Sequence, residues 1–160
     1  MKILIFGGQK SGKSRIAEEK SLSLSTHKPT YIATYHDSYA DSEMQKRITA
    51  HQAQRQERFI TIEEPKDLES VIQKGTYLVD CVSMWILNLM DEKALLSQLE
   101  TLSKKDVNIV FVLNEVTSGV IPMDKESRKF VDLTGIIGQK LAQLCDEVYE
   151  VKFGIEVQIK

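Results

Sequence analysis

The chain has 160 residues, with 21 basic and 23 acidic side chains and a formal net charge of −2. This balance excludes a global electrostatic attraction to nucleic acid or to an anionic membrane, so partners have to be sought at local sites. The length fits one domain over residues 1–160, and no apolar run approaches the roughly 20 residues that span a bilayer. Cys81 and Cys145 lie far apart without metal-ligand spacing. We therefore expect reduced thiols in a cytoplasmic protein.

Short β-rich runs alternate with helical patterns along the chain. Strands are predicted at Ile3–Phe6, Tyr31–Ala33, Phe59–Ile62, Tyr77–Val79, Ile109–Leu113 and Val148–Val151, with Val157–Ile159 as a closing strand. Helical spacing is found near Glu43–Arg58, Asp67–Gln73, Ser83–Met90, Ala94–Lys104 and Ser127–Leu144. Such alternation predicts right-handed crossovers and a mainly parallel sheet, that is, an α/β fold. Ligands of such sheets bind beyond the carboxyl ends of the strands.

The first predicted strand runs directly into GGQKSGKS, which satisfies the phosphate-loop pattern GxxxxGK[ST]. Glycines allow the backbone to form a concave nest whose N–H groups point at phosphate oxygens. Lys13 is expected to contact the β- and γ-phosphates, and Ser14 to offer its hydroxyl to Mg²⁺. The helix that follows places its positive dipole end at the bound anion. The chain is thus predicted to bind a nucleoside triphosphate; a chance glycine turn is the alternative interpretation.

The segment 41–58 carries Arg47, His51 and Arg55 at i, i+4 and i+8, on one face of a predicted helix. One interpretation is a solvated basic stripe. The other is a functional site, because neighbouring positive charge favours the neutral, nucleophilic imidazole and also collects phosphate oxygens. His36, just past the second strand, is a further residue that we expect near the site.

Polar residues also follow the later strands. Asp80 ends the Tyr77–Val79 strand, at the place of a carboxylate that holds Mg²⁺ directly or through water. Glu63 and Glu64 follow the third strand, where each is either a ribose partner or simply solvated. Asn114 follows the fifth strand. The residues after it do not match NKxD, the pattern by which regulatory GTPases recognise guanine, so the identity of the base stays open.

Taken in order, the motifs GGQKSGKSRIAE, YIAT, EMQKRITAHQAQR, TIEEP, LVDC, NEV, GVIP, DLTG and DEVYEV resemble one enzyme family over nearly the whole chain. It is the bifunctional adenosylcobinamide kinase/adenosylcobinamide-phosphate guanylyltransferase family of cobalamin nucleotide-loop assembly. The resemblance implies a RecA-like P-loop NTPase with three layers and a mainly parallel central sheet, as a homotrimer. It also implies two reactions: phosphorylation of adenosylcobinamide by ATP or GTP, then transfer of GMP from GTP to adenosylcobinamide phosphate.

By the same resemblance, the His of the RIxxH element carries GMP as a phosphoramidate, and His51 matches it. Lys13 is expected to be the second catalytic residue, and Ser14 and Asp80 are expected to hold Mg²⁺. The nucleotide contacts that the resemblance implies are Gly7, Gly8, Gln9, Lys10, Ser11, Gly12, Lys13, Ser14, Thr34, Tyr35, His36, Gln52, Ala53, Gln54, Arg55, Glu63 and Asp80.

The sequence departs from the family pattern at several positions. Gln56 stands where the family has Pro, Phe59 where it has Trp, and Thr117 where it has Gly, and the later GxxNQxLA pattern loses its Asn at Gly138. Corrinoid contacts or subunit packing are therefore expected to differ. The alternative functions are a P-loop kinase of another small alcohol, a RecA-like nucleotide-dependent regulatory module, and a family member with one of the two activities. The sequence has no Lys/Arg-rich tail, and this argues against nucleic-acid binding.

Overall fold

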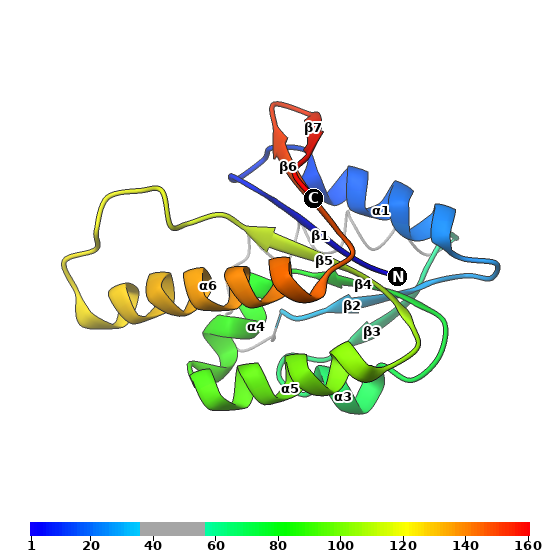
Figure 1. The fold of residues 1–160 in the computed structure, drawn as a ribbon, viewed down its shortest axis with the longest axis horizontal. Coiled ribbons are helices and arrows are strands. Elements are labelled where there is room, and N and C mark those ends of the chain that lie inside the picture. Colours follow the sequence, from blue (N-terminus) through cyan, green and yellow to red (C-terminus); the bar gives the residue numbers. More distant parts are fainter. Residues whose placement is uncertain (36–56) are drawn as a thin grey trace.

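The computed structural model describes residues 1–35 and 57–160, which form an α/β fold (Figure 1). The strands are β1 Lys2–Gly7, β2 Thr30–Ala33, β3 Ile60–Glu63, β4 Thr76–Asp80, β5 Asn108–Asn114, β6 Glu147–Lys152 and β7 Ile155–Gln158. The helices are α1 Lys13–Leu24, α3 Leu68–Val71, α4 Val82–Leu89, α5 Glu92–Lys104 and α6 Lys125–Leu144. All seven predicted strands are confirmed within one to two residues. The predicted helix at Glu43–Arg58 lies outside the described residues, apart from its last two positions.

The strands form one sheet in the order β3-β2-β4-β5-β1-β6-β7. All neighbouring pairs are parallel except β6 with β7, which form an antiparallel hairpin. The central strands β4, β5 and β1 are nearly all apolar because both of their faces are covered. The predicted mainly parallel sheet is confirmed.

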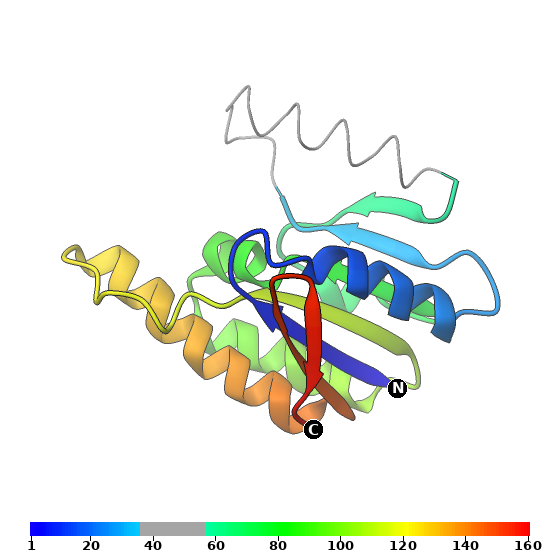
Figure 2. The same cartoon turned by 90° about the horizontal axis from the view of Figure 1, so that it is seen from above.

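Helices cover the two faces of the sheet unequally (Figures 1 and 2). On one face α1 packs through Ile16 and Ala17 against alternate residues of the sheet, including Ile5 and Val112. On the other face α3, α4, α5 and α6 enclose a larger core around Trp85 and Phe111. These are the three layers that the family resemblance implies, and the carboxyl ends of the parallel strands share one edge.

Side chains stabilise the ends of α5 and α6, the helices on the face of the sheet that carries the larger core. Asp91 and Asp124 accept hydrogen bonds from the backbone N–H groups of Ala94 and Ser127 and thereby cap α5 and α6. At the other end of α6, the Lys160 ammonium donates to the carbonyls of residues 142, 143 and 145, at 3.0, 3.1 and 2.7 Å. A cation at this position complements the negative end of the helix dipole. The C-terminal lysine thus ties β7 to α6.

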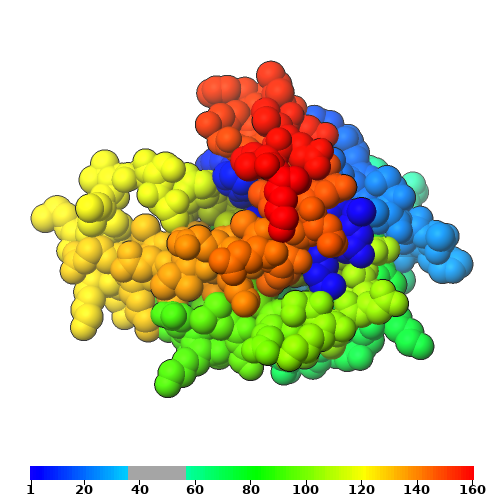
Figure 3. Space-filling model, in the orientation of Figure 1, coloured from blue at the N-terminus to red at the C-terminus, as the bar shows by residue number. Residues whose placement is uncertain are grey.

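The loop between β5 and α6, residues 115–123, projects from the body of the molecule (Figure 3). Val120, Ile121 and Met123 in this loop are exposed. The loop leaves the carboxyl edge of the sheet, the edge at which ligands of parallel sheets bind. None of the helices in the described part of the chain is long and apolar enough to cross a membrane.

Candidate nucleotide-binding site

The GxxxxGKS segment forms the loop between β1 and α1 that the sequence predicts. Gly12 caps the helix with a φ of +96°, a conformation that a side chain disfavours. Gly7 is required for space, since a Cβ there would lie 2.3 Å from the carbonyl oxygen of Val151 on the neighbouring strand. A Cβ on Gly8 would meet nothing within 4 Å, so the fold itself does not require glycine at that position.

Lys13 lies at the first position of α1 and is only 6% exposed. Its ammonium donates a 2.9 Å hydrogen bond to the carbonyl of Gly8, within the loop itself. Burial lowers the pKa of Lys13 from its ordinary value, and the negative charge of Asp80 opposes that shift. A buried ammonium folded over its own loop is suited to bind a phosphate, which would supply the countercharge that burial demands.

Asp80 ends β4 on the face that α1 covers, and the hydroxyl of Tyr31 on β2 donates a 3.0 Å hydrogen bond to it. The register of β2 and β4 brings the two together, with Tyr31 opposite Leu78 and Ala33 opposite Asp80. The Asp80 carboxylate and the Ser14 hydroxyl are the hard oxygen donors that Mg²⁺ prefers, and phosphate oxygens and water supply its remaining ligands in such sites. The chemistry of these two side chains therefore suits Mg²⁺ beside a bound triphosphate, and the magnesium site stays a prediction.

Thr34, the first residue after β2, is fully buried. Its hydroxyl donates to the carbonyl of Cys81 at 2.7 Å and accepts from the Cys81 N–H at 3.0 Å, which links the ends of β2 and β4. The Asn88 amide of α4 donates to the carbonyls of Thr34 and Pro65. The side chain of Thr34 thus holds the carboxyl edge together, and its contact with nucleotide stays a prediction.

The two glutamates after β3 have different surroundings. Glu64 accepts hydrogen bonds from the backbone N–H groups of Lys66 and Asp67, so it stabilises a turn. Glu63 is exposed at the carboxyl end of β3, on the same edge as the phosphate loop. Of the two side chains, that of Glu63 is the more exposed and is therefore accessible to a ligand. Its contact with nucleotide stays a prediction.

Glu115 follows β5, and its backbone N–H donates to the carbonyl of Gly7 beside the phosphate loop. Burial acts to raise the pKa of its carboxyl, but hydrogen bonds from Thr117 and Ser118 outweigh this effect and lower the pKa below its ordinary value. The sequence does not predict that Glu115 organises the following turn, since its hydrogen-bond partners are set by the loop conformation.

Part of the predicted site lies outside the described residues. These positions are His36, His51, Gln52, Ala53, Gln54 and Arg55. The segment that contains them begins after β2, at the carboxyl edge of the sheet that carries Thr34, and it ends before β3, whose first residue Ile60 pairs with Thr30 at the opposite, amino edge. The structure brings together the phosphate loop, Lys13 and Asp80, and leaves the role of His51 a prediction.

A family model described as cobinamide kinase / cobinamide phosphate guanyltransferase, CobU, matches residues 3–159. The chain belongs to this family.

Curated relatives of this CobU-family chain agree with it over their whole lengths. The bifunctional adenosylcobalamin biosynthesis protein CobP of Pseudomonas aeruginosa is 35% identical over 100% of this chain and 98% of its own length. The bifunctional adenosylcobalamin biosynthesis protein CobU of Escherichia coli is 32% identical over 100% of both chains. The resemblance drawn from the motifs is therefore confirmed, and with it the enzyme class.

Among solved structures, the flagellar accessory protein FlaH from Methanocaldococcus jannaschii is similar in fold, with a TM-score of 0.51. The similarity covers 99% of this chain and 77% of FlaH. At 12% sequence identity it shows a shared fold and nothing about function. This supports the RecA-like P-loop fold class predicted from the sequence.

Within this CobU-family chain, Thr117 is one of the departures from the family pattern that the structure explains. Its backbone N–H donates to the Glu115 carboxylate at 2.6 Å, and its hydroxyl donates to the same oxygen. A glycine at this position would lack the hydroxyl. The substitution thus adds a hydrogen bond that fixes the start of the 115–123 loop.

Proposed function

We propose that this chain phosphorylates adenosylcobinamide with a nucleoside triphosphate and then transfers GMP from GTP to the adenosylcobinamide phosphate. The observation that carries the proposal is the full-length family match, combined with a phosphate loop in which the buried Lys13 ammonium bonds to the Gly8 carbonyl and lies near the charge of Asp80. One phosphate loop serves both reactions, because each of them begins with a triphosphate seated in the same nest.

In the first reaction the aminopropanol hydroxyl of adenosylcobinamide attacks the γ-phosphorus. The new oxygen–phosphorus bond forms as the bond to the nucleoside diphosphate breaks, and the hydroxyl proton is lost to the surroundings. Lys13 offsets the charge that develops on the phosphate oxygens in a partly desolvated nest. Mg²⁺, when bound to Ser14 and Asp80, would add a second positive charge at the phosphates.

In the second reaction we propose that His51 is the nucleophile. Its neutral imidazole attacks the α-phosphorus of GTP and pyrophosphate leaves, which gives a phosphoramidate. A phosphate oxygen of adenosylcobinamide phosphate then attacks the same phosphorus and releases His51, and the product is adenosylcobinamide-GDP. The family resemblance and the two flanking arginines of the sequence support this role.

The resemblance further supports a homotrimer in the cytoplasm, which we keep as part of the proposal. Sedimentation of the purified chain measures the oligomeric state directly.

The experiment that tests the function is incubation of the protein with adenosylcobinamide and GTP-Mg²⁺, followed by product analysis. We expect adenosylcobinamide phosphate first, and then adenosylcobinamide-GDP with one equivalent of pyrophosphate. Formation of the phosphate alone would support a simple kinase. GTP hydrolysis without either corrinoid product would support a regulatory module and contradict the proposal.

A further inference from the structure

The turn between β6 and β7 has an unusual composition. Lys152 pairs with Ile155, so the connection is the two-residue turn Phe153-Gly154, with φ of +50° and +80°. Positive φ at both central residues is the property of a type I′ turn, whose first position favours Asn, Asp or Gly. A bulky residue at positive φ is disfavoured there. The backbone alone therefore gives no reason for phenylalanine at position 153.

Packing gives no reason either, since the Phe153 side chain is 96% exposed. An exposed aromatic ring gains nothing from burial, and it stands in a strained backbone conformation. Exposed aromatic rings next to ligand sites serve as stacking surfaces.

The turn rests on the rim of the phosphate loop (Figure 2). The N–H of Gly154 donates a 2.7 Å hydrogen bond to the carbonyl of Ser11. A Cβ on Gly12 would lie 3.2 Å from the Cα of Gly154, so the two backbones are in close contact. Phe153 is thus held next to the N-terminus of α1, where the triphosphate is bound.

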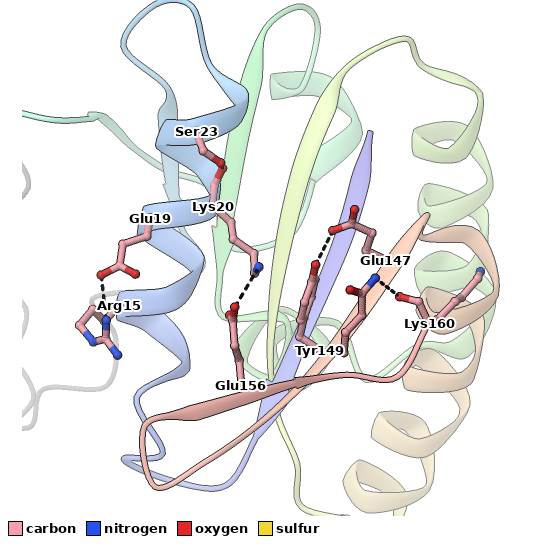
Figure 4. A network of polar contacts seen from close by, with 9 residues as sticks. Arg15, Glu19, Lys20, Ser23, Glu147, Tyr149, Glu156 and Lys160 are labelled. Carbon is pink, nitrogen blue, oxygen red and sulfur yellow. Dashed lines mark hydrogen bonds and ion pairs between the residues drawn. The ribbon is translucent and has the colours of Figure 1, made fainter.

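The hairpin is also braced against α1 (Figure 4). The Lys20 ammonium lies 3.7 Å from the centre of the Tyr149 ring on β6 and 3.4 Å from the Glu156 carboxylate on β7. These contacts join both strands of the hairpin to the helix that follows the phosphate loop. The position of the turn relative to the loop is therefore fixed from two directions.

The strand order places Phe153 on the opposite side of the phosphate loop from two predicted nucleotide contacts, Thr34 and Glu63. Thr34 and Glu63 follow β2 and β3, whereas β6 and β7 lie on the other side of β1. With neighbouring strands about 4.8 Å apart, the β3 and β7 ends of the sheet are about 29 Å apart, so one base does not reach both sides.

We propose that Phe153 is the stacking surface for the base of the nucleoside triphosphate that donates its γ-phosphoryl group. The predicted nucleotide contacts Thr34 and Glu63 follow β2 and β3, so GTP in the GMP-transfer reaction is assigned a base position toward those strands. The proposal rests on the proposed function and assigns the two reactions different base positions around one phosphate loop. Since every base has a π-face, ATP and GTP are both expected to use Phe153 in the phosphorylation step.

The kinetic test compares Phe153→Ala with wild type in the two reactions separately. Phosphorylation of adenosylcobinamide is measured against ATP and GTP concentration, and GMP transfer is measured from adenosylcobinamide phosphate and GTP. We expect the nucleotide KM of phosphorylation to rise about 5-fold or more, as loss of base stacking predicts, with GMP transfer at the wild-type rate. Phe153→Trp keeps a stacking surface and is expected to retain a low KM. Ile155→Ala, which removes an exposed apolar side chain from the same hairpin, is the matched control and should behave as wild type.

The binding test needs no turnover. Calorimetry with Mg-ATP and with magnesium tripolyphosphate should show that Phe153→Ala weakens binding of ATP only, because tripolyphosphate has no base. Equal weakening of both ligands would mean that the turn only supports the loop, and unchanged ATP affinity would refute the stacking role. A sedimentation change in Phe153→Ala with unchanged ATP affinity would assign the ring to contact between copies and overturn the proposal. Failure of the proposed function is distinct, since it would appear as absent corrinoid products in wild type.

Discussion

The hydroxyl of Tyr31 donates a 3.0 Å hydrogen bond to the carboxylate of Asp80, although the two residues are 49 positions apart in sequence. Tyr31 is itself 6% exposed, with its ring packed edge-on against Phe59. A buried donor thus holds one oxygen of the proposed magnesium ligand. Partners of this kind orient a ligand and tune its affinity for the metal.

Removal of that hydroxyl in Tyr31→Phe should raise the Mg²⁺ concentration needed for half-maximal phosphorylation by about 10-fold, the usual effect of losing such a partner. The measurement is the kinase rate as a function of free Mg²⁺ at saturating nucleotide. Tyr77→Phe is the control. Among the described residues, the Tyr77 hydroxyl accepts a hydrogen bond from the Gln73 backbone N–H and donates one to the Lys74 carbonyl, so its loss leaves Asp80 untouched. An unchanged Mg²⁺ dependence in Tyr31→Phe would remove Asp80 from the metal site.

Lys13→Ala should lower the rates of phosphorylation and GMP transfer by about 10²-fold or more, by analogy with the loss of one oxyanion donor. The fold should persist, because burial of the Lys13 ammonium is itself unfavourable, as its lowered pKa indicates. Initial rates of both reactions and the thermal unfolding midpoint are measured on the same preparation. Near wild-type rates would show that the triphosphate binds elsewhere.

His51→Ala should separate the two activities. Phosphorylation of adenosylcobinamide persists, since the substrate hydroxyl is its own nucleophile, while GMP transfer falls to background. GTP labelled at the α-phosphate should leave acid-labile, base-stable label on the wild-type protein and none on His51→Ala. Equal labelling of both proteins would exclude His51 and make His36 the next candidate.

Gly7→Ala should destabilise the protein by about 1–3 kcal/mol, the cost of overpacking, because the new Cβ would lie 2.3 Å from the Val151 carbonyl. Gly8→Ala is the matched variant in the same loop, and its Cβ meets nothing within 4 Å. We expect Gly8→Ala to unfold at the wild-type urea concentration. Urea unfolding followed by circular dichroism measures both, and equal stability of the two variants would contradict the close packing of β1 on β6.

Alkaline pH should lower the free energy of unfolding through the two cysteine thiols. Burial raises the pKa of Cys145 to about 12, and burial together with the Asp80 charge raises the pKa of Cys81 to about 11. The folded state therefore keeps these protons at a pH where the unfolded thiols, with ordinary pKa near 9, lose them. This contribution to stability is complete below pH 9 and is lost as pH rises toward 11 and 12. The free energy of unfolding of Cys145→Ala should fall less steeply between pH 9 and 11 than that of wild type.

The sequence by itself determined the parts of this protein that depend on local pattern. The spacing of Gly7, Gly12, Lys13 and Ser14 after an apolar run predicted a strand, a glycine-containing loop and a helix, and the structure confirms this arrangement. The alternation of runs predicted the parallel sheet, because a strand buried on both faces is continuously apolar. Asp80 was predicted as a magnesium ligand from its place at a strand end, and the structure confirms that place. The order of motifs, with RIxxH among them, predicted the family that the full-length match confirms.

The tertiary structure decided which of these pieces touch. The contacts between Tyr31 and Asp80, and between Gly154 and Ser11, join residues 49 and 143 positions apart, and they depend on strand order and register rather than on local composition. Sequence reasoning assigned Thr34 to the nucleotide, yet strand pairing places its hydroxyl on the Cys81 peptide group. Phe153 attracted no notice in the sequence, because a lone phenylalanine has meaning only once the hairpin sets it, exposed, on the rim of the phosphate loop.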